Sequence, residues 1–300
     1  MVGDEDLRCP ATGARLRRDG TVLRTEDGAR EYPIVGGVPV LIASERSVFG
    51  IPERPEPSRG LVRRLAAKLP RDTKNVGTDA LVARLRELLP ERPRVLVVGG
   101  GTLGAGMGPL LDDPAVDATE TDVWFGPLTR LVCDGHDLPF PDATFDAVVC
   151  QAVLEHVLDP PRVVAEIHRV LRPDGLLYAE IPFMQQVHEG AHDLTRYTYV
   201  GQRRLFRDFD EVAAGAVCGP AMALAWSLRY LAATIFGRRA AHLVALLTFW
   251  LPRVDRWLIA KPGALDAASS IGFLGRRREA PLGDAEIIAA YRGLNATRGG

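Results

Sequence analysis

Short apolar runs alternate with a helical pattern from Arg94 onward, and this alternation constrains the fold more than any other feature of the sequence. The runs lie at residues 95–98, 131–133, 147–150 and 176–181. Runs without regular polar positions are typical of parallel strands that are covered on both faces. Asp159 and Pro160 supply the cap and the first residue of a helix between two of these runs. The alternation predicts a doubly wound α/β sheet.

The first apolar run leads directly into a glycine-rich loop, Gly99-Gly100-Gly101-Thr102-Leu103-Gly104. Glycines let a backbone approach a ligand closely and turn into the start of a helix. The spacing also fits the dinucleotide pattern Gly-x-Gly-x-x-Gly, in which a carboxylate about 20 residues further on binds ribose hydroxyls. Glu120 or Asp122 could fill that role in a nicotinamide enzyme or an adenosylmethionine enzyme. The loop alone therefore does not choose between these two classes.

Three further motifs come after the glycine loop in order, at Cys133–Phe140, Phe145–His156 and Glu166–Gly175. Together the four motifs resemble the large class I S-adenosylmethionine-dependent methyltransferase family, over roughly residues 93–200. Gly100 replaces the cysteine or small residue usual in the first motif, and Asp174 replaces a glycine in the last. Because aspartate tolerates turn conformations, we expect no loss of function from the second change.

The resemblance implies a Rossmann-like, mostly parallel sheet of seven strands whose last strand is antiparallel. We expect the sixth strand at residues 211–217 and the seventh at residues 270–275. It also implies that S-adenosylmethionine is the cofactor and that the glycines at 99, 100, 101 and 104 surround its methionine portion. The sequence thus predicts a methyltransferase core with a small N-terminal β module and a helical insertion.

The same resemblance implies further cofactor contacts. A carboxylate after the second strand would hold the ribose hydroxyls, and Asp134 would accept a hydrogen bond from the adenine amino group, near the backbone of Gly135 and His136. Gln151 would face the methionine end or the methyl acceptor. Val116, Ala118 and Glu120 share one phase of the strand's two-residue period, so we rank Glu120 first and Asp122 second for the ribose.

Candidate residues for the methyl acceptor lie after the fifth strand, because ligands of doubly wound sheets bind beyond the carboxyl ends of the strands. A base is needed only if the acceptor loses a proton. For each candidate, pinning of the loop by hydrogen bonds is an equally good explanation. The candidates are His188, His192 and Asp193 for catalysis, and His156, Arg196 and Tyr197 for substrate binding.

Metal binding is not predicted from the sequence. Glu155, His188 and His192 could be drawn as ligands, but nothing in their spacing requires a metal. The N-terminal module resembles the small zinc-ribbon-like activators of methyltransferases, yet Cys9 stands alone and Thr12 occupies its partner position. Since a structural zinc needs about four ligands, we expect no zinc in this module.

The chain divides into five expected segments. The second contains a basic stretch from Arg59 to Lys74, which we interpret as a solvated helix face, and a lead-in helix at residues 80–89. The segments are a β module at 1–44, a connector at 45–92, the methyltransferase core at 93–219, a helical insertion at 220–264, and a final strand and tail at 265–300.

The segment from Met222 to Gly263 combines apolar, tryptophan and basic residues with a single acid, Asp255. We expect a helical lid over the acceptor side of the active site or a homodimer face. The alternative is a peripheral helix at an anionic membrane surface, where tryptophan and arginine are common. No signal peptide, spanning segment or disulfide framework is apparent, which favours the cytoplasm, either free or membrane-associated.

The leading hypothesis is methyl transfer to a small-molecule or lipid-linked acceptor. An RNA methyltransferase comes second, supported by the activator-like N-terminus and the basic connector. The net charge of −1 argues against nucleic-acid binding without excluding it. A nicotinamide-dependent dehydrogenase explains the glycine loop but not the later motifs. A non-catalytic cofactor-binding scaffold is the remaining alternative.

Overall fold

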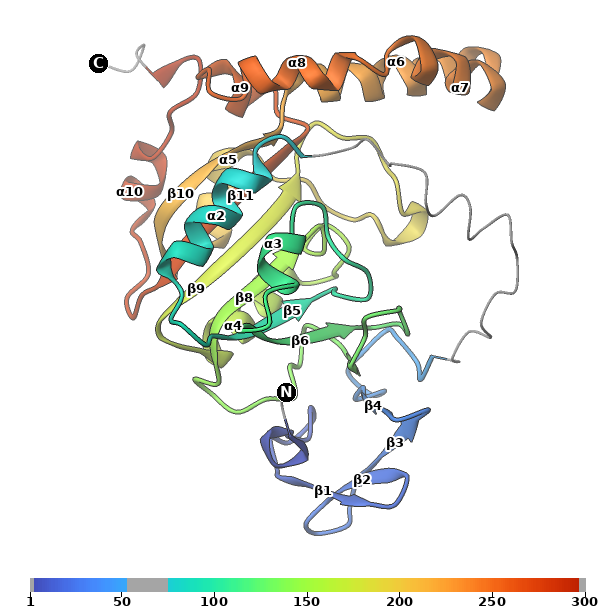
Figure 1. Ribbon diagram of the computed structural model, residues 1–300, viewed down its shortest axis with the longest axis vertical. Helices are drawn as coiled ribbons and strands as arrows, with labels where there is room; N and C mark the ends of the chain where they lie inside the picture. Colours follow the sequence, from blue (N-terminus) through green and yellow to red (C-terminus); the bar gives the residue numbers. More distant parts are fainter. Residues whose placement is uncertain (1–2, 53–74, 297–300) are drawn as a thin grey trace.

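The computed structural model describes residues 3–52 and 75–296, so the basic connector residues from Arg59 to Lys74 lie outside the described part. One mixed sheet of eleven strands forms the centre of the molecule, in the order β1-β2-β3-β4-β7-β6-β5-β8-β9-β11-β10 (Figure 1). Its core strands are β5 Arg94–Val98, β6 Asp117–Asp122, β7 Leu131–Cys133, β8 Phe145–Gln151, β9 Leu171–Pro182, β10 Phe209–Cys218 and β11 Ser270–Arg277.

The strand order from β7 to β10 is that of the expected fold. Neighbouring strands from β7 to β9 pair in parallel, and β11 lies antiparallel between β9 and β10. The predicted Rossmann-like α/β class is therefore confirmed, including the antiparallel last strand. The strand count differs because the N-terminal module continues the same sheet.

Both faces of the core sheet are covered, which explains the apolar runs. Val95 and Val97 of β5 belong to one buried cluster, with Val82 and Leu85 of a covering helix. Leu96 and Val98 face the opposite cluster, where a second helix packs through apolar residues that include Ile167. The helices are α2 Thr78–Leu88 and α4 Pro160–Val170, and α5 Tyr199–Leu205 and α10 Asp284–Ala289 lie near the far edge.

The N-terminal module is a four-stranded meander joined to the core sheet. Its strands are β1 Leu16–Asp19, β2 Val22–Thr25, β3 Glu31–Val35 and β4 Val38–Leu41, preceded by the short helix η1 Asp4–Asp6. The last of these pairs in parallel with β7, Val40 against Val132 and Leu41 against Cys133. Cys9 is buried with its Sγ 3.1 Å from the Tyr32 hydroxyl. The expected lack of zinc in this module stays a prediction.

The segment between the glycine loop and β6 contains little helix, although the loop was expected to turn into one. A single helical turn, α3 Gly108–Leu111, lies between β5 and β6. Residues 99–109 include Gly104, Gly106, Gly108 and Pro109. Since glycine and proline are the weakest helix formers, a long helix is not favoured here.

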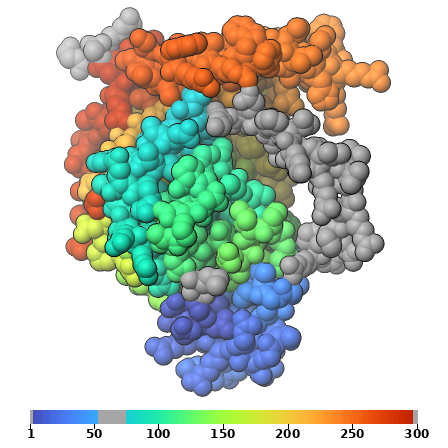
Figure 2. All heavy atoms as spheres, viewed as in Figure 1, coloured from blue at the N-terminus to red at the C-terminus, as the bar shows by residue number. Residues whose placement is uncertain are grey.

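Four helices form the insertion between β10 and β11. They are α6 Pro220–Phe236, α7 Arg238–Leu247, α8 Leu251–Leu258 and α9 Gly263–Asp266, and they form a layer at the end of the molecule opposite the N-terminal module (Figures 1 and 2). Asp255 of α8 is buried and accepts hydrogen bonds from the backbone N–H groups of Gly219, Ala221 and Met222. The single acid of the segment therefore caps the first turn of α6. Within the described residues, no helix meets the length and hydropathy needed to cross a membrane.

Candidate functional site

A cavity of about 390 Å³ opens at the carboxyl ends of the central strands. Its volume lies in the range of small-molecule sites, about 300–1,000 Å³. The chain leaves β5 towards β6 and β7 on one side, and β8 lies on the other, so the cavity occupies the topological switch point of the sheet. Four strand ends contribute lining residues, which are Val98 and Gly99, Thr121 and Asp122, Cys133 and Asp134, and Ala152 and Val153.

Asp122 holds the glycine loop to the end of β6. Its Oδ2 accepts a hydrogen bond from the Gly101 N–H at 3.0 Å, and its Oδ1 accepts from the Trp124 N–H at 3.1 Å. A Cβ atom at Gly101 would lie 2.6 Å from Asp122 Oδ2, so a side chain there would displace this carboxylate. Each carboxylate oxygen keeps a lone pair for a ligand hydroxyl.

Glu120, ranked first for the ribose, lies outside the cavity, whereas Asp122 lines it. It pairs with Val97 inside the sheet, and its Oε2 lies 2.9 Å from Arg130 Nε. Glu120 and Asp122 share the predicted phase, but two residues advance the chain by roughly 6.6 Å along a strand. Only Asp122 therefore reaches the strand end where the cavity opens.

Asp134 is a buried carboxylate at the end of β7. Its Oδ1 accepts from the His136 backbone N–H at 3.0 Å and lies 2.6 Å from His136 Nδ1, while the Ser47 hydroxyl donates to Oδ2. Burial raises the pKa of Asp134, but the hydrogen bonds from His136 and Ser47 outweigh it and hold the pKa below its ordinary value. The carboxylate is thus kept ionised as an acceptor.

His136 positions Asp134 rather than lining the cavity. Its Nε2 accepts from the Asp159 N–H at 3.1 Å, so Nδ1 carries the proton that faces Asp134. Gly135 does line the cavity. Gln151 does not line the cavity. Its Nε2 donates a hydrogen bond to the carbonyl of Ala105, the residue directly after the glycine loop, at 2.9 Å.

The acceptor-side candidates separate into two groups. His156 and His192 line the cavity, together with Glu189, which the sequence analysis did not single out. Asp193 does not, because its side chain is fully buried, ion-paired with Arg196, and accepts from the His188 N–H at 2.8 Å. The Arg196 hydrogen bonds hold the pKa of Asp193 well below its ordinary value.

These contacts favour loop pinning for the Asp193–Arg196 pair over a role as a base. Tyr197 packs against the main buried cluster instead of the cavity. Of the residues expected to act in catalysis, His192 is thus the one that lines the cavity.

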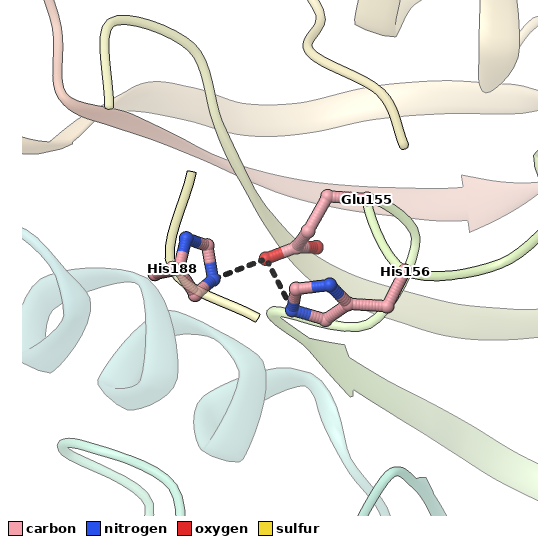
Figure 3. Close-up of side chains that lie close together, drawn as sticks. All are labelled: Glu155, His156 and His188. Atoms are coloured by element: carbon pink, nitrogen blue, oxygen red, sulfur yellow. Dashed lines mark ion pairs between the residues drawn. The ribbon is translucent and has the colours of Figure 1, made fainter. Parts of the chain in front are cut away.

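Two histidines surround a buried glutamate beside the cavity (Figure 3). Glu155 is fully buried, and neither carboxylate oxygen has a hydrogen-bond partner in any other described residue. Its Oε1 lies 3.6 Å from His156 Nε2 and 3.9 Å from His188 Nε2. Burial raises the pKa of Glu155 to about 8. The sequence analysis considered Glu155, His188 and His192 as possible metal ligands. In the structure, His156 instead of His192 lies beside Glu155 and His188.

Phe49 and Trp124 line the cavity, but the sequence analysis did not predict them as site residues. Phe49 lies beyond the N-terminal module, and its ring centroid is 5.8 Å from that of Trp124 and 6.1 Å from that of His192. Trp124 could have been noticed as an aromatic residue two positions after Asp122. The approach of Phe49 depends on how the module joins β7, which no local pattern reveals.

Comparison with known proteins finds a family model and several relatives that match part of the chain. Residues 111–179, less than a quarter of the chain, match the family model for a methyltransferase domain. The mitochondrial arginine hydroxylase NDUFAF5 of Rattus norvegicus is 43% identical over 60 residues, which cover 20% of this chain and 17% of the relative. A demethylmenaquinone methyltransferase of Symbiobacterium thermophilum is 44% identical over 66 residues, which cover 21% and 26% of the two chains.

A probable S-adenosylmethionine-dependent methyltransferase of Mycolicibacterium smegmatis is 46% identical over 46 residues, covering 15% of this chain and 18% of the relative. A phosphoethanolamine N-methyltransferase of Haemonchus contortus, solved with S-adenosyl-L-methionine, has 15% identity and a TM-score of 0.43 over 67% of this chain and 53% of that one. The chain spans only 17% to 26% of the length of these three curated relatives. Residues 111–179 thus match a methyltransferase domain, and the Mycolicibacterium smegmatis relative is described as S-adenosylmethionine-dependent.

Proposed function

We propose that this protein is an S-adenosylmethionine-dependent methyltransferase that transfers a methyl group to a small-molecule or lipid-linked acceptor. One observation carries the proposal: the glycine loop, Asp122 and Asp134 meet at a single cavity at the switch point of the sheet. Strand ends that line this cavity fall within the segment that matches a methyltransferase domain.

The residues present fit this cofactor. Gly99 and Thr102 of the glycine loop line the cavity, Asp122 offers acceptors for a ribose diol, and Asp134 offers an acceptor for an amino group. When bound, the cofactor supplies an electrophilic methyl group on a sulfonium. The protein positions the acceptor in line with this methyl group. His156 and His192 are the side chains on the acceptor side that could orient it or take a proton.

Asp134→Ala tests the adenine assignment. The variant should bind S-adenosylmethionine about 1–3 kcal/mol more weakly, because the buried amino donor would lose its acceptor. Isothermal titration calorimetry on the parent and the variant measures the difference. Equal affinities would show that Asp134 does not contact the adenine.

We also propose that the helical insertion, residues 220–264, contacts an anionic membrane surface. Four leucine or isoleucine side chains of α6, at positions 224, 228, 231 and 235, form one exposed stripe at helical spacing. Six basic residues accompany a single acid in residues 220–264, and that acid, Asp255, is buried. Each basic residue near an anionic surface contributes about 1 kcal/mol to binding. We therefore propose a cytoplasmic enzyme that associates peripherally with membranes.

The insertion braces the acceptor loop but does not line the cavity. Gln186 Nε2 donates to Ser227 Oγ at 3.0 Å, and the Tyr230 hydroxyl donates to the Val187 carbonyl. None of the described residues that line the cavity comes from residues 220–264. Within the described residues, the insertion therefore does not cover this cavity as expected; it contacts the acceptor loop, and the stripe on α6 is exposed.

Flotation with vesicles of anionic phospholipid tests the membrane contact. The parent should float, and a variant with Phe236→Ser, Leu246→Ser and Trp257→Ser should not, because these exposed side chains supply the apolar contact. Ile288→Ser on α10, 70% exposed in the parent, is the matched control and should float. A parent that stays with the soluble fraction, or that forms a dimer through this face, contradicts the membrane contact.

Methyl transfer itself is tested with radiolabelled S-adenosylmethionine and a cell extract as the source of acceptors. We expect labelled products that are small or extractable into organic solvent, identified by mass spectrometry. Label in RNA would instead favour the RNA methyltransferase alternative. Cofactor binding without any labelled product from varied extracts would point to the scaffold alternative.

A further inference from the structure

We propose that Glu155, His156 and His188 bind a divalent transition-metal ion beside the cofactor cavity. The three residues come from two segments, the loop after β8 and the loop after β9, and their side chains point towards one another (Figure 3). Their ligand atoms all lie within 4.8 Å of one another. No other group of three metal-ligating side chains occurs in the residues that the structure describes.

The spacing of the ligand atoms suits a metal better than direct hydrogen bonds. Glu155 Oε1 lies 3.6 Å and 3.9 Å from the two Nε2 atoms, and hydrogen bonds of this kind are shorter, at about 2.7–3.2 Å. Zinc bonds to nitrogen and oxygen are about 2.0–2.2 Å long, so two ligands of one ion can be as far as roughly 4 Å apart. Small side-chain rotations would complete the site.

Both imidazoles are held so that Nε2 is free to bind a metal. His156 Nδ1 lies 2.9 Å from the His192 carbonyl oxygen, which can only accept, so Nδ1 carries the proton. His188 Nδ1 faces two acceptors, Asp193 Oδ2 at 3.2 Å and the Gln186 carbonyl at 3.4 Å. Metal-bound histidines regularly donate their other N–H to a carbonyl or carboxylate in this way.

The buried carboxylate supplies the independent observation. Glu155 is fully buried, and both of its oxygens lack a partner in any other described residue. At 3.6 Å and 3.9 Å, neither imidazole Nε2 is close enough to form a hydrogen bond with it. A carboxylate left this way is costly, and a cation between the three groups would satisfy all of them at once.

The donor set indicates the kind of ion and its place in the reaction. Two imidazoles and a carboxylate suit zinc, iron or manganese and leave coordination positions open. His156 also lines the cofactor cavity, so an open position would adjoin the acceptor side. Resting on the proposed function, we infer an acceptor with an oxygen atom that the ion can bind.

Zinc titration of the full chain, after removal of metals by a chelator, tests the site. Calorimetry should show about one equivalent bound by the parent, and Glu155→Gln and His188→Gln should each weaken zinc binding at least tenfold, as loss of a ligand requires. His242→Gln, an exposed histidine on α7, is the matched control and should bind like the parent. Cys9→Ala should also bind like the parent, since the N-terminal module is not involved.

S-adenosylmethionine titrations of the same samples keep this inference separate from the proposed function. Glu155→Gln and His188→Gln should retain cofactor binding, which also shows that they are folded. Equal zinc affinity in the parent and both variants would overturn the metal site. So would a parent that binds no zinc.

Discussion

Asp122→Ala is expected to weaken S-adenosylmethionine binding by roughly 3 kcal/mol, or about 100-fold in Kd. The carboxylate would lose two roles together, as acceptor for the ribose hydroxyls and as anchor of the loop through the Gly101 N–H. Calorimetric titration measures the change, and circular dichroism shows that the variant is folded.

Glu120→Ala is the matched control for that prediction. It removes a carboxylate from the same strand and phase, but one that pairs with Arg130, whose side chain is 57% exposed, and that does not line the cavity. Such a pair contributes about 0–1 kcal/mol to stability, and cofactor affinity should stay close to that of the parent. A large loss with Glu120→Ala and none with Asp122→Ala would restore the ranking expected from the sequence.

Asp255→Ala should destabilise the helical layer by roughly 3 kcal/mol. Three buried backbone N–H groups, those of Gly219, Ala221 and Met222, would lose their acceptor at the start of α6, and each such donor costs about 1–3 kcal/mol when left unpaired. Hydrogen exchange should therefore accelerate along α6 more than in the core strands.

Asp255→Asn provides the comparison for this effect. It keeps one acceptor oxygen and loses the charge that suits a helix N-terminus, so its exchange rates should fall between those of the parent and the alanine variant. Unchanged exchange of α6 amides in Asp255→Ala would contradict the capping role.

Core strands could be predicted because both faces of the sheet are buried, so every residue of such a strand has to be apolar. Val95 and Val97 pack on one face of the sheet and Leu96 and Val98 on the other, so an unbroken apolar run is required. The cap and proline that begin α4 are equally local signals. By contrast, the joining of β4 to β7 depends on pairing between segments about ninety residues apart.

The candidate site was predictable where it lies at strand ends and less so elsewhere. Asp134 and the glycine loop were found because they come directly after β7 and β5. Glu120 was ranked first on strand phase, which does not say where a strand ends, and only Asp122 lines the cavity. Phe49 and Ser47 were missed because tertiary packing brings Phe49 to the cavity and Ser47 to Asp134. Hydropathy likewise could not tell that α6 turns its leucine stripe outward.

The cofactor assignment is tested most directly by calorimetric titration of the purified full chain with S-adenosylmethionine and, separately, with NAD. We expect saturable binding of S-adenosylmethionine at one site, weakened about 100-fold in Asp122→Ala, and no heat from NAD beyond dilution. Binding of NAD to the parent, with no detectable binding of S-adenosylmethionine, would contradict the assignment and favour a dehydrogenase.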